Sequence, residues 1–342
     1  MAKQAVLLLA HGTPETVEQI PEYLRNVVSG HPLAQAVIEE IQHRYSLIGR
    51  SPLTEITFEQ ARLVEAELAQ GRIVEAELAA GGAPVPVYVA MRNWRPYIPN
   101  VVRQMRSNGV EEAAVVCMAP QNSRTSVGLY RRAVEAEAVG LRIDFTEAWA
   151  QHPLLVEAFA ERLRPAFDRL SAEVGHAVPV LFTAHSVPCR TIQTPAASQT
   201  QDAQPRLWPG AGADPYAEEA KRTAALVAER VPEIPQWYFA FQSQGAGGGP
   251  GSAITWLGPT VEQTLDGLAA EGVRTLLLQP IGFLCDHVEI LYDVDILFRG
   301  YAAKLGIRLE RPASLNASPV LARAVADLAR QGLARLQDSR AD

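Results

Sequence analysis

The sequence lacks the features that mark several classes of protein. Its 31 Lys and Arg residues against 38 Asp and Glu residues give a formal net charge of −7, and no basic run offsets that balance. Because nucleic-acid binding needs clustered Lys and Arg to neutralise phosphates, we expect no nucleic-acid partner. No stretch of about 18 apolar residues occurs, so we expect no transmembrane segment.

Cysteine is also scarce, and its spacing is uninformative for metals. Cys117, Cys189 and Cys285 are far apart and form no C-x-x-C pair, so neither a zinc ribbon nor a sequence-local iron–sulfur motif is expected. An odd number of scattered cysteines fits a reducing compartment. The apolar run at residues 5–10 is too short for a membrane helix and lacks a signal cleavage site. We therefore interpret it as a first strand and predict a cytoplasmic protein.

What remains is an ordinary globular composition. Of 342 residues, 48% are apolar and 20% are charged, enough for about two domains. Eight short apolar runs recur along the chain, and runs of this kind are typical of strands buried on both faces. They are Ala5–Ala10, Val85–Met91, Ala113–Met118, Arg142–Thr146, Val178–Thr183, Trp237–Phe241, Val273–Gln279 and Ile307–Leu309.

Helical patterns lie between these runs, for example at Pro153–Val174 and Pro259–Gly272. Strands that alternate with helices predict an α/β fold with parallel sheets covered by helices on both faces. We expect a first half at residues 1–150, a second half at 151–318, and a C-terminal helix and tail at 319–342.

A faint internal repeat supports two related halves. The sequence LLLAHGTP at residues 7–14 resembles VLFTAHSVP at residues 180–188. In each, an apolar strand ends in Ala-His, and a Pro follows three residues after the His. His11 and His185 would then occupy equivalent places at the carboxyl ends of two strands, where open α/β sheets bind ligands.

A local duplication and two polar stretches carry no evident chemistry. ARLVEAELAQ at residues 61–70 is followed by GRIVEAELAA at residues 71–80, which predicts a lengthened surface helix. Thr191–Ala213 is rich in Pro, Gln and Ala, and residues 244–252 are rich in Gly. Since no Lys-Ser/Thr follows the glycines, we interpret both stretches as loops and not as phosphate-binding sites.

The segment at residues 280–295, PIGFLCDHVEILYDVD, is the densest group of candidate ligands. If it is helical, Asp286, Glu289 and Asp293 share one face, because they lie three and four residues apart. Acidic residues near a helix start also favour the helix dipole, which is a purely structural explanation for Asp286. It explains Asp293 poorly.

An imidazole and a carboxylate at strand ends can face the same cleft. Both bind first-row divalent metals, and both accept protons. A permanent zinc site usually has three or four protein ligands. His185 with Glu289 and a trailing acidic row therefore favours a metal that passes through.

Nine segments in order over nearly the whole chain resemble the ferrochelatases, enzymes that insert ferrous iron into a porphyrin at the end of haem synthesis. The resemblance implies two Rossmann-like domains, each with a parallel four-stranded sheet flanked by helices, and a porphyrin cleft between them. The segments are HGTP at 11–14, HRYSLIGRSPLTEIT at 43–57, VYVAMRNWRPYI at 87–98, APQNSRTSVGLY at 119–130, FTAHSVP at 182–188, GADPYAEEA at 212–220, FQSQ at 241–244, WLGP at 256–259 and PIGFLCDHVEILYDVD at 280–295.

The resemblance assigns roles by position. His185 and Glu289 match the family's catalytic, metal-binding and proton-accepting pair, and Asp293 continues the acidic track from Glu289. The positions that match porphyrin-contacting residues are His11, Arg44, Tyr45, Ser51 and Tyr130. The structural alternatives are a solvated helix charge for Arg44, a core position for Tyr130 and a helix entry for Ser51.

Two departures from the family bear on the substrate and on cofactors. Val28 stands where some relatives have a basic residue for a propionate, so the choice between protoporphyrin IX and coproporphyrin III stays open. No Cys follows Cys285, so we expect no iron–sulfur cluster. The expected ligands are the porphyrin and Fe²⁺, both as substrates, and no permanently bound cofactor is expected. Peripheral contact with a membrane or with a haem-pathway partner stays open as a further expectation.

Two other functions stay open at this point. One is a chelatase that inserts cobalt or nickel into another tetrapyrrole. The other is a non-enzymatic haem- or porphyrin-binding protein, which would need a gripping cleft but no proton acceptor such as Glu289.

Overall fold

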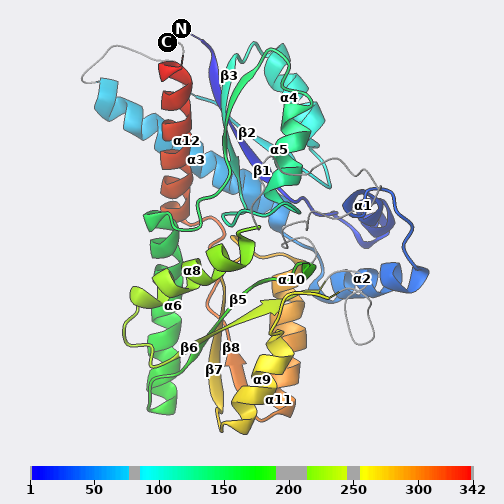
Figure 1. Cartoon of the computed structure of the whole chain (residues 1–342), viewed down its shortest axis with the longest axis vertical. Coiled ribbons are helices and arrows are strands. Elements are labelled where there is room, and N and C mark those ends of the chain that lie inside the picture. The colour runs from blue at the N-terminus through cyan, green and yellow to red at the C-terminus, as the bar shows by residue number, and fades with distance from the viewer. Residues whose placement is uncertain (1, 77–84, 190–213, 245–254, 340–342) are drawn as a thin grey trace, which may run out of the picture.

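The strands form two parallel sheets with the same order of strands. In this computed structural model, which describes residues 2–76, 85–189, 214–244 and 255–339, the orders are β2-β1-β3-β4 and β6-β5-β7-β8. Figure 1 shows the two sheets one above the other along the long axis. The strands are β1 (Gln4–Ala10), β2 (Val87–Met91), β3 (Glu112–Cys117), β4 (Arg142–Thr146), β5 (Val180–His185), β6 (Trp237–Gln242), β7 (Thr275–Pro280) and β8 (Arg308–Glu310).

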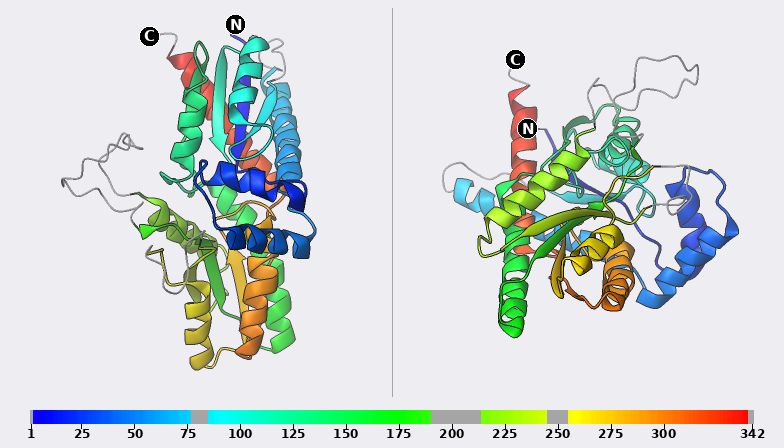
Figure 2. Two further views of the ribbon diagram at one scale, coloured as in Figure 1. Left: turned by 90° about the vertical axis from the view of Figure 1, so that its right-hand side faces the viewer. Right: turned by 60° about the horizontal axis from the view of Figure 1, so that its bottom comes forward.

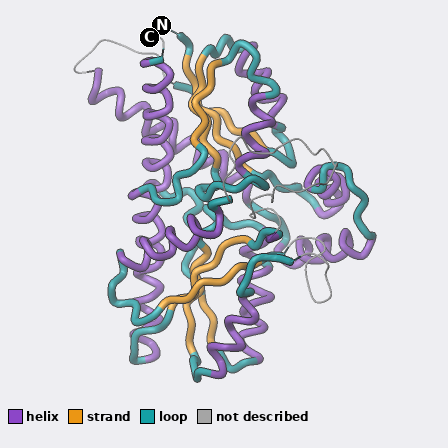
Figure 3. Tube along the Cα trace, in the orientation of Figure 1, coloured by secondary structure: helices purple, strands orange, loops and turns teal. Residues whose placement is uncertain are grey.

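All eight predicted strands are confirmed, as is the α/β class. The reason lies in their burial. Along β1, Val6 and Leu8 belong to one apolar cluster, whereas Leu7 and Leu9 belong to another on the opposite face. Each sheet is therefore covered by helices on both faces, as long apolar runs predict, and Figure 3 shows helices on either side of both groups of strands.

The helices include the long segment predicted between the two halves, α6, which has the predicted bounds. Among the described residues, no helix has the length and apolar character needed to cross a bilayer. The helices are η1 (Val17–Gln19), α1 (Ile20–Val27), α2 (Gln35–Ile48), α3 (Leu53–Ala76), α4 (Ile98–Ser107), α5 (Val127–Glu135), α6 (Pro153–Val174), α8 (Tyr216–Glu229), α9 (Val261–Ala270), α10 (Val288–Leu291), the π-helix η2 (Asp293–Phe298), α11 (Arg299–Lys304) and α12 (Pro319–Asp338).

The C-terminal helix α12 returns to the first half of the chain. It packs against α3, β3 and β4 as well as α6, and Arg335 binds both oxygens of Asp144 at 2.7 and 2.8 Å. One apolar cluster accordingly runs from the first sheet to the second through α3, α6 and α12. The two sheets are thus held by a shared core along one side.

The opposite side carries α1 and α2, which lie across the junction of the two sheets (Figure 2). Helix α2 contacts α10 of the second half. The carboxyl ends of β1 and β5 therefore open toward a region that α1, α2 and α10 surround. The loop at Thr191–Ala213, residues 245–252 of the Gly-rich stretch and residues 77–80 of the duplication lie outside the described residues.

Candidate active site

His185 and Glu289 form the centre of the candidate site. His185 is the last residue of β5, and its Nε2 lies 3.1 Å from Oε1 of Glu289. Its Nδ1 donates a hydrogen bond to the Ser186 carbonyl oxygen. About a third of each side chain is exposed, 30% for His185 and 33% for Glu289. The pair is therefore fixed in place and still accessible to a ligand.

The backbone of Glu289 is held by its neighbours in sequence and in the sheet. Its amide donates to Nδ1 of His287 at 3.0 Å, and this contact begins α10. Its carbonyl oxygen accepts from Nε2 of Gln242 at 2.9 Å, and Oε1 of Gln242 accepts from Thr183 at 2.6 Å. Both strands that border the site, β5 and β6, thus position the carboxylate.

The charges of the pair depend on each other. Burial lowers the pKa of His185, but the Glu289 carboxylate, then the Ser186 carbonyl and Asp293, together raise that pKa above the ordinary value. Burial opposes ionisation of Glu289, but His185, followed by His287 and His11, holds the pKa of Glu289 below its usual range. The two side chains thus stabilise each other's charged forms, so His185 holds a proton more readily than an isolated histidine does.

His11 occupies the place in the first sheet that His185 occupies in the second. It directly follows β1, and β1 and β5 hold the same position in the two strand orders, so the predicted equivalence is confirmed. Burial, followed by the charge of Arg92, lowers the pKa of His11 to about 4. The amide Nδ2 of Asn93 lies 3.0 Å from its Nε2. His11 is therefore neutral at pH 7 and retains a lone pair.

Gly12, which follows His11, allows the backbone at this point to pack closely against Met91 and Trp94. Gly12 has φ +82°, and a Cβ at this residue would lie 2.9 Å from the Cβ atoms of Met91 and Trp94. Any other residue would push the His11 loop away from β2. The HGTP motif thus serves the position of the imidazole.

Asp293 begins the π-helix that continues α10. It is buried, accepts a hydrogen bond from Ser243, and lies 3.5 Å from Nη1 of Arg44. Burial, followed by the Glu289 charge, raises the pKa of Asp293 to about 6. Asp293 is thus a carboxylate that can gain or lose a proton near neutral pH.

The predicted single helical face at residues 286–293 is wrong in part. The helix begins at Val288, so Asp286 lies before it. There Asp286 pairs with Arg311 and does not join Glu289 and Asp293. The amides of Ile296 and Leu297 both point to the Tyr292 carbonyl, at 3.0 and 2.9 Å, and this π turn interrupts the regular 3.6-residue spacing.

Four further residues were predicted to contact a porphyrin. Arg44 pairs with Glu40 at 3.0 Å, in addition to Asp293. The buried Tyr45 hydroxyl lies 2.9 Å from the Thr13 hydroxyl, and burial raises the pKa of Tyr45 to about 12. The Ser51 hydroxyl is buried, and no partner for it lies within the part of the chain that the structure describes.

Tyr130 is buried beneath a charged neighbour that sequence reasoning missed. The guanidinium of Arg92 lies 6.0 Å from the Tyr130 ring centroid and donates to the Thr125 carbonyl at 3.3 Å. Among the described residues, no carboxylate pairs with Arg92. A largely buried cation without a counter-ion, close to His11, is a candidate group for binding an acidic substrate.

The structure brings His185, Glu289, His11 and Asp293 into one electrostatic group, with Arg44 joined to Asp293. It does not join Ser51 to them. Among the described residues, no set of three His, Cys, Asp or Glu side chains is grouped as a resident metal site. Sequence reasoning missed members of the site that lie in segments quoted above, namely Arg92, Gln242 and Ser243.

Comparisons with known proteins agree on one family. The ferrochelatase family model matches residues 3–333. A ferrochelatase from Acidobacterium capsulatum is 56% identical over 340 residues, covering 99% of this chain and 97% of that protein. A coproporphyrin III ferrochelatase from Mycolicibacterium vanbaalenii is 34% identical, covering 96% of this chain and 89% of that protein.

A solved structure shares the fold at low identity. The sirohydrochlorin chelatase from Bacillus subtilis subspecies spizizenii, in complex with cobalt, matches with a TM-score of 0.51 and 11% identity, covering 96% of this chain and 95% of that chain. This likeness concerns the arrangement of two α/β halves. The family match along nearly the whole sequence, with 56% identity to a protein named ferrochelatase, leads to one conclusion: the chain belongs to the ferrochelatase family.

Proposed function

We propose that this protein inserts Fe²⁺ into a porphyrin, with release of two pyrrole protons, as a step of haem biosynthesis. The observation that carries the proposal is the pair of His185 and Glu289, 3.1 Å apart at the carboxyl end of β5. The chemistry needs a proton acceptor and a metal ligand side by side. Family membership supports this assignment.

In this proposal, the pair takes protons from the porphyrin through Nε2 of His185. Because Nδ1 donates to the Ser186 carbonyl, neutral His185 presents its lone pair at Nε2. Once Nε2 is protonated, the adjacent Glu289 carboxylate stabilises the imidazolium. The same lone pair and carboxylate can bind Fe²⁺ when the proton is absent, so metal and proton compete at one place.

His11 serves the opposite side of the proposed site. Its low pKa, about 4, keeps the imidazole neutral, so it adds no repulsion to Fe²⁺, and it would become a metal ligand only by giving up its contact with the Asn93 amide. Asp293 extends the site along η2 and changes its protonation near pH 6. It is proposed to pass Fe²⁺ in or protons out.

The porphyrin would be held by its carboxylates and its flat face. Arg92 and Arg44 are the proposed charge partners for propionates, with Ser51, Tyr45 and Tyr130 as further contacts. Arg92 is the stronger candidate, since Arg44 already pairs with Glu40 and Asp293. The proposed substrate is protoporphyrin IX or coproporphyrin III, and a relative named for coproporphyrin III supports the second. The proposal needs no bound cofactor.

Anaerobic incubation tests the function directly. Fe²⁺ is mixed with the protein and, separately, with protoporphyrin IX or coproporphyrin III, and the absorbance change of metallation is followed. The proposal predicts catalytic turnover with at least one porphyrin. Glu218→Gln, at an exposed position of α8 with 85% of its side chain accessible, is the matched control and should keep the wild-type rate.

Two outcomes would replace the proposal. Tight porphyrin binding without turnover would indicate a binding protein. Turnover only with sirohydrochlorin and Co²⁺ or Ni²⁺ would indicate a different chelatase.

A further inference from the structure

A buried arginine joins the two ends of the segment that carries Glu289 and Asp293. Arg311 directly follows β8, and only 12% of its side chain is exposed. Its Nη2 lies 3.2 Å from Oδ1 of Asp286 and 2.7 Å from Oδ2 of Asp295. Its Nε lies 2.8 Å from Oδ1 of Asp295. The guanidinium therefore binds Asp295 with two parallel bonds and Asp286 with a third.

Asp286 is fixed by further contacts beyond Arg311. Its carboxylate accepts from Ser314 at 2.7 Å and from Nδ2 of Asn316 at 2.8 Å. Its backbone amide donates to Oδ1 of Asn316, also at 2.8 Å. Gln60 of α3 donates to the Asn316 carbonyl at 2.9 Å. The start of the segment is thus tied to the first half of the chain as well.

The segment between these anchor points is not a regular α-helix. Asp286 lies three residues before Glu289, and Asp295 lies two residues after Asp293. Between them, α10 has only four residues and passes into a π turn. The helical run continues through η2 into α11, but the π turn breaks its regular hydrogen-bond pattern beside Asp293, so contacts with the rest of the fold help to set the geometry there.

We propose that Arg311, with Asp286 and Asp295, is a clamp that positions Glu289 and Asp293 for metal insertion. Arg311 is a positioning residue, because its described partners lie behind the site and it reaches the pair only through Asp286 and Asp295. This inference rests on the proposed function and deepens it. It places the control of the acidic residues on a side chain 22 positions beyond Glu289 in the sequence.

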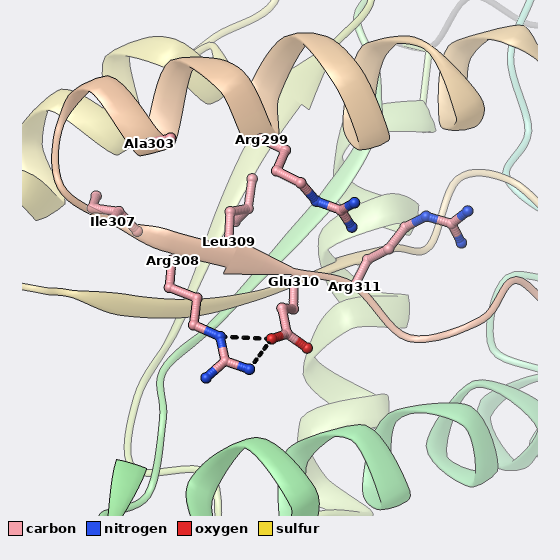
Figure 4. Close-up of a pocket in the computed structure, with 7 residues that line it drawn as sticks. All are labelled: Arg299, Ala303, Ile307, Arg308, Leu309, Glu310 and Arg311. Atoms are coloured by element: carbon pink, nitrogen blue, oxygen red, sulfur yellow. Dashed lines mark hydrogen bonds and ion pairs between the residues drawn. The ribbon is translucent and has the colours of Figure 1, made fainter. Parts of the chain in front are cut away.

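A neighbouring arginine supplies a matched control. Arg299 and Arg311 both line a cavity of about 400 Å³ beside β8 (Figure 4). Arg299 also pairs with Asp295, but at 3.5 Å and with 52% of its side chain exposed. Its one described ion pair is with Asp295, so it joins no second anchor. Arg299→Lys therefore changes the same cavity and another contact of Asp295, keeps the charge, and does not open the clamp.

The first variant is Arg311→Lys, which keeps the charge and removes the planar fork. Loss of such supporting contacts typically lowers metal affinity or activity 10–100-fold. We expect kcat to fall by about that factor, porphyrin Kd to stay within about twofold, and Arg299→Lys to match the wild type. If Arg311→Lys turns over at the wild-type rate, the clamp is overturned.

A second variant guards against simple unfolding. Arg311→Met leaves two partly buried carboxylates, 20% and 22% exposed, without the cation that joins them, and this loss destabilises the fold. Combining it with Asp286→Asn and Asp295→Asn removes those charges. The triple variant should fold, as judged by its circular dichroism and melting temperature, and still show the reduced kcat. Wild-type kcat in the folded triple variant would mean that Arg311 only neutralises charge.

Binding of Zn²⁺ alone to the porphyrin-free protein separates this inference from the proposed function. Arg311→Lys should weaken Zn²⁺ binding about 10–100-fold in the wild-type background and have no further effect in a Glu289→Gln background. That result supports the clamp even if no porphyrin is metallated. Equal weakening in both backgrounds, or none in either, shows that Arg311 does not act through Glu289 and overturns the proposal.

Discussion

The two sheets place a histidine at the same topological position and give it opposite chemistry. His11 after β1 and His185 at the end of β5 correspond in strand order. The pKa of His11 is lowered to about 4, whereas that of His185 is raised. His11 is bonded to the uncharged Asn93 and lies near Arg92, whereas His185 faces Glu289.

The repeated fold therefore sets the position of each histidine, and the side chains around it determine whether its pKa is lowered or raised. A neutral imidazole is a ligand that holds no proton to exchange near pH 7, and an imidazole paired with a carboxylate is a proton carrier. A site that must exchange two protons for one dication needs both kinds. Substitution of either histidine, or of the side chain next to it, tests this difference.

The largest expected effect on kcat comes from removing His185, the proposed proton carrier. His185→Ala should lower kcat roughly a thousandfold, about 4 kcal/mol of activation free energy, while porphyrin still binds. His11→Ala should lower kcat by no more than about tenfold, about 1.4 kcal/mol. Anaerobic metallation rates measure kcat, and porphyrin fluorescence titration measures porphyrin binding. Equal losses in the two variants would remove the distinction between the halves.

A single substitution can make His11 resemble His185. Asn93→Asp puts a carboxylate next to Nε2 of His11, now 3.0 Å from the Asn93 amide. An opposite charge favours the imidazolium, so the pKa of His11 should rise from about 4 by roughly one to two units. NMR titration of the histidine ring protons reports this value. An unchanged pKa would show that Arg92 and burial alone control His11.

The reverse substitution should make His185 resemble His11. In Glu289→Gln the carboxylate that raises the pKa of His185 is gone, while the burial that lowers it remains. The pKa of His185 should therefore fall below its ordinary value. The same NMR titration, with Glu218→Gln as the unaffected control, gives the answer. A pKa that stays raised would assign the effect to another group, such as Asp293.

The smallest effects concern Asp293. The pKa of Asp293 is about 6 in the folded protein and about 3.8 as a free side chain, so the carboxyl group favours folding below pH 4, and that contribution is lost as pH rises to 6. Asp293→Asn should therefore be roughly 2 kcal/mol more stable, relative to the wild type, at pH 8 than at pH 4. Urea unfolding at both pH values measures this difference.

The same variant should raise the KM for Fe²⁺ a few-fold with kcat nearly unchanged, because Asp293 lies beyond Glu289 on the acidic track. A large drop in kcat instead would place Asp293 in the proton transfer itself.

Much of the fold followed from the sequence because its signal is local. Each strand is a run of apolar residues buried on both faces, and α6 has an apolar stripe over its whole length, so both periodicities were visible. The equivalence of His11 and His185 was readable for the same reason, since both end such a run.

The site was less predictable where it depends on irregular backbone or on distant partners. A uniform helical spacing placed Asp286 beside Glu289, but the helix starts two residues after Asp286 and then widens into a π turn. Nothing in the local pattern marks that widening. Arg92 and Arg311 were missed because an arginine's partner is known only once the chain is folded.

The most direct test of the account is the anaerobic turnover of folded Glu289→Gln with Fe²⁺ and whichever porphyrin the wild type accepts. Glutamine keeps the size of the side chain and removes the charge that binds metal and holds the proton on His185. The account predicts at least a hundredfold loss of kcat, about 2.7 kcal/mol, with porphyrin Kd within a few-fold of wild type and Glu218→Gln unaffected. Turnover near the wild-type rate in the folded variant would contradict it.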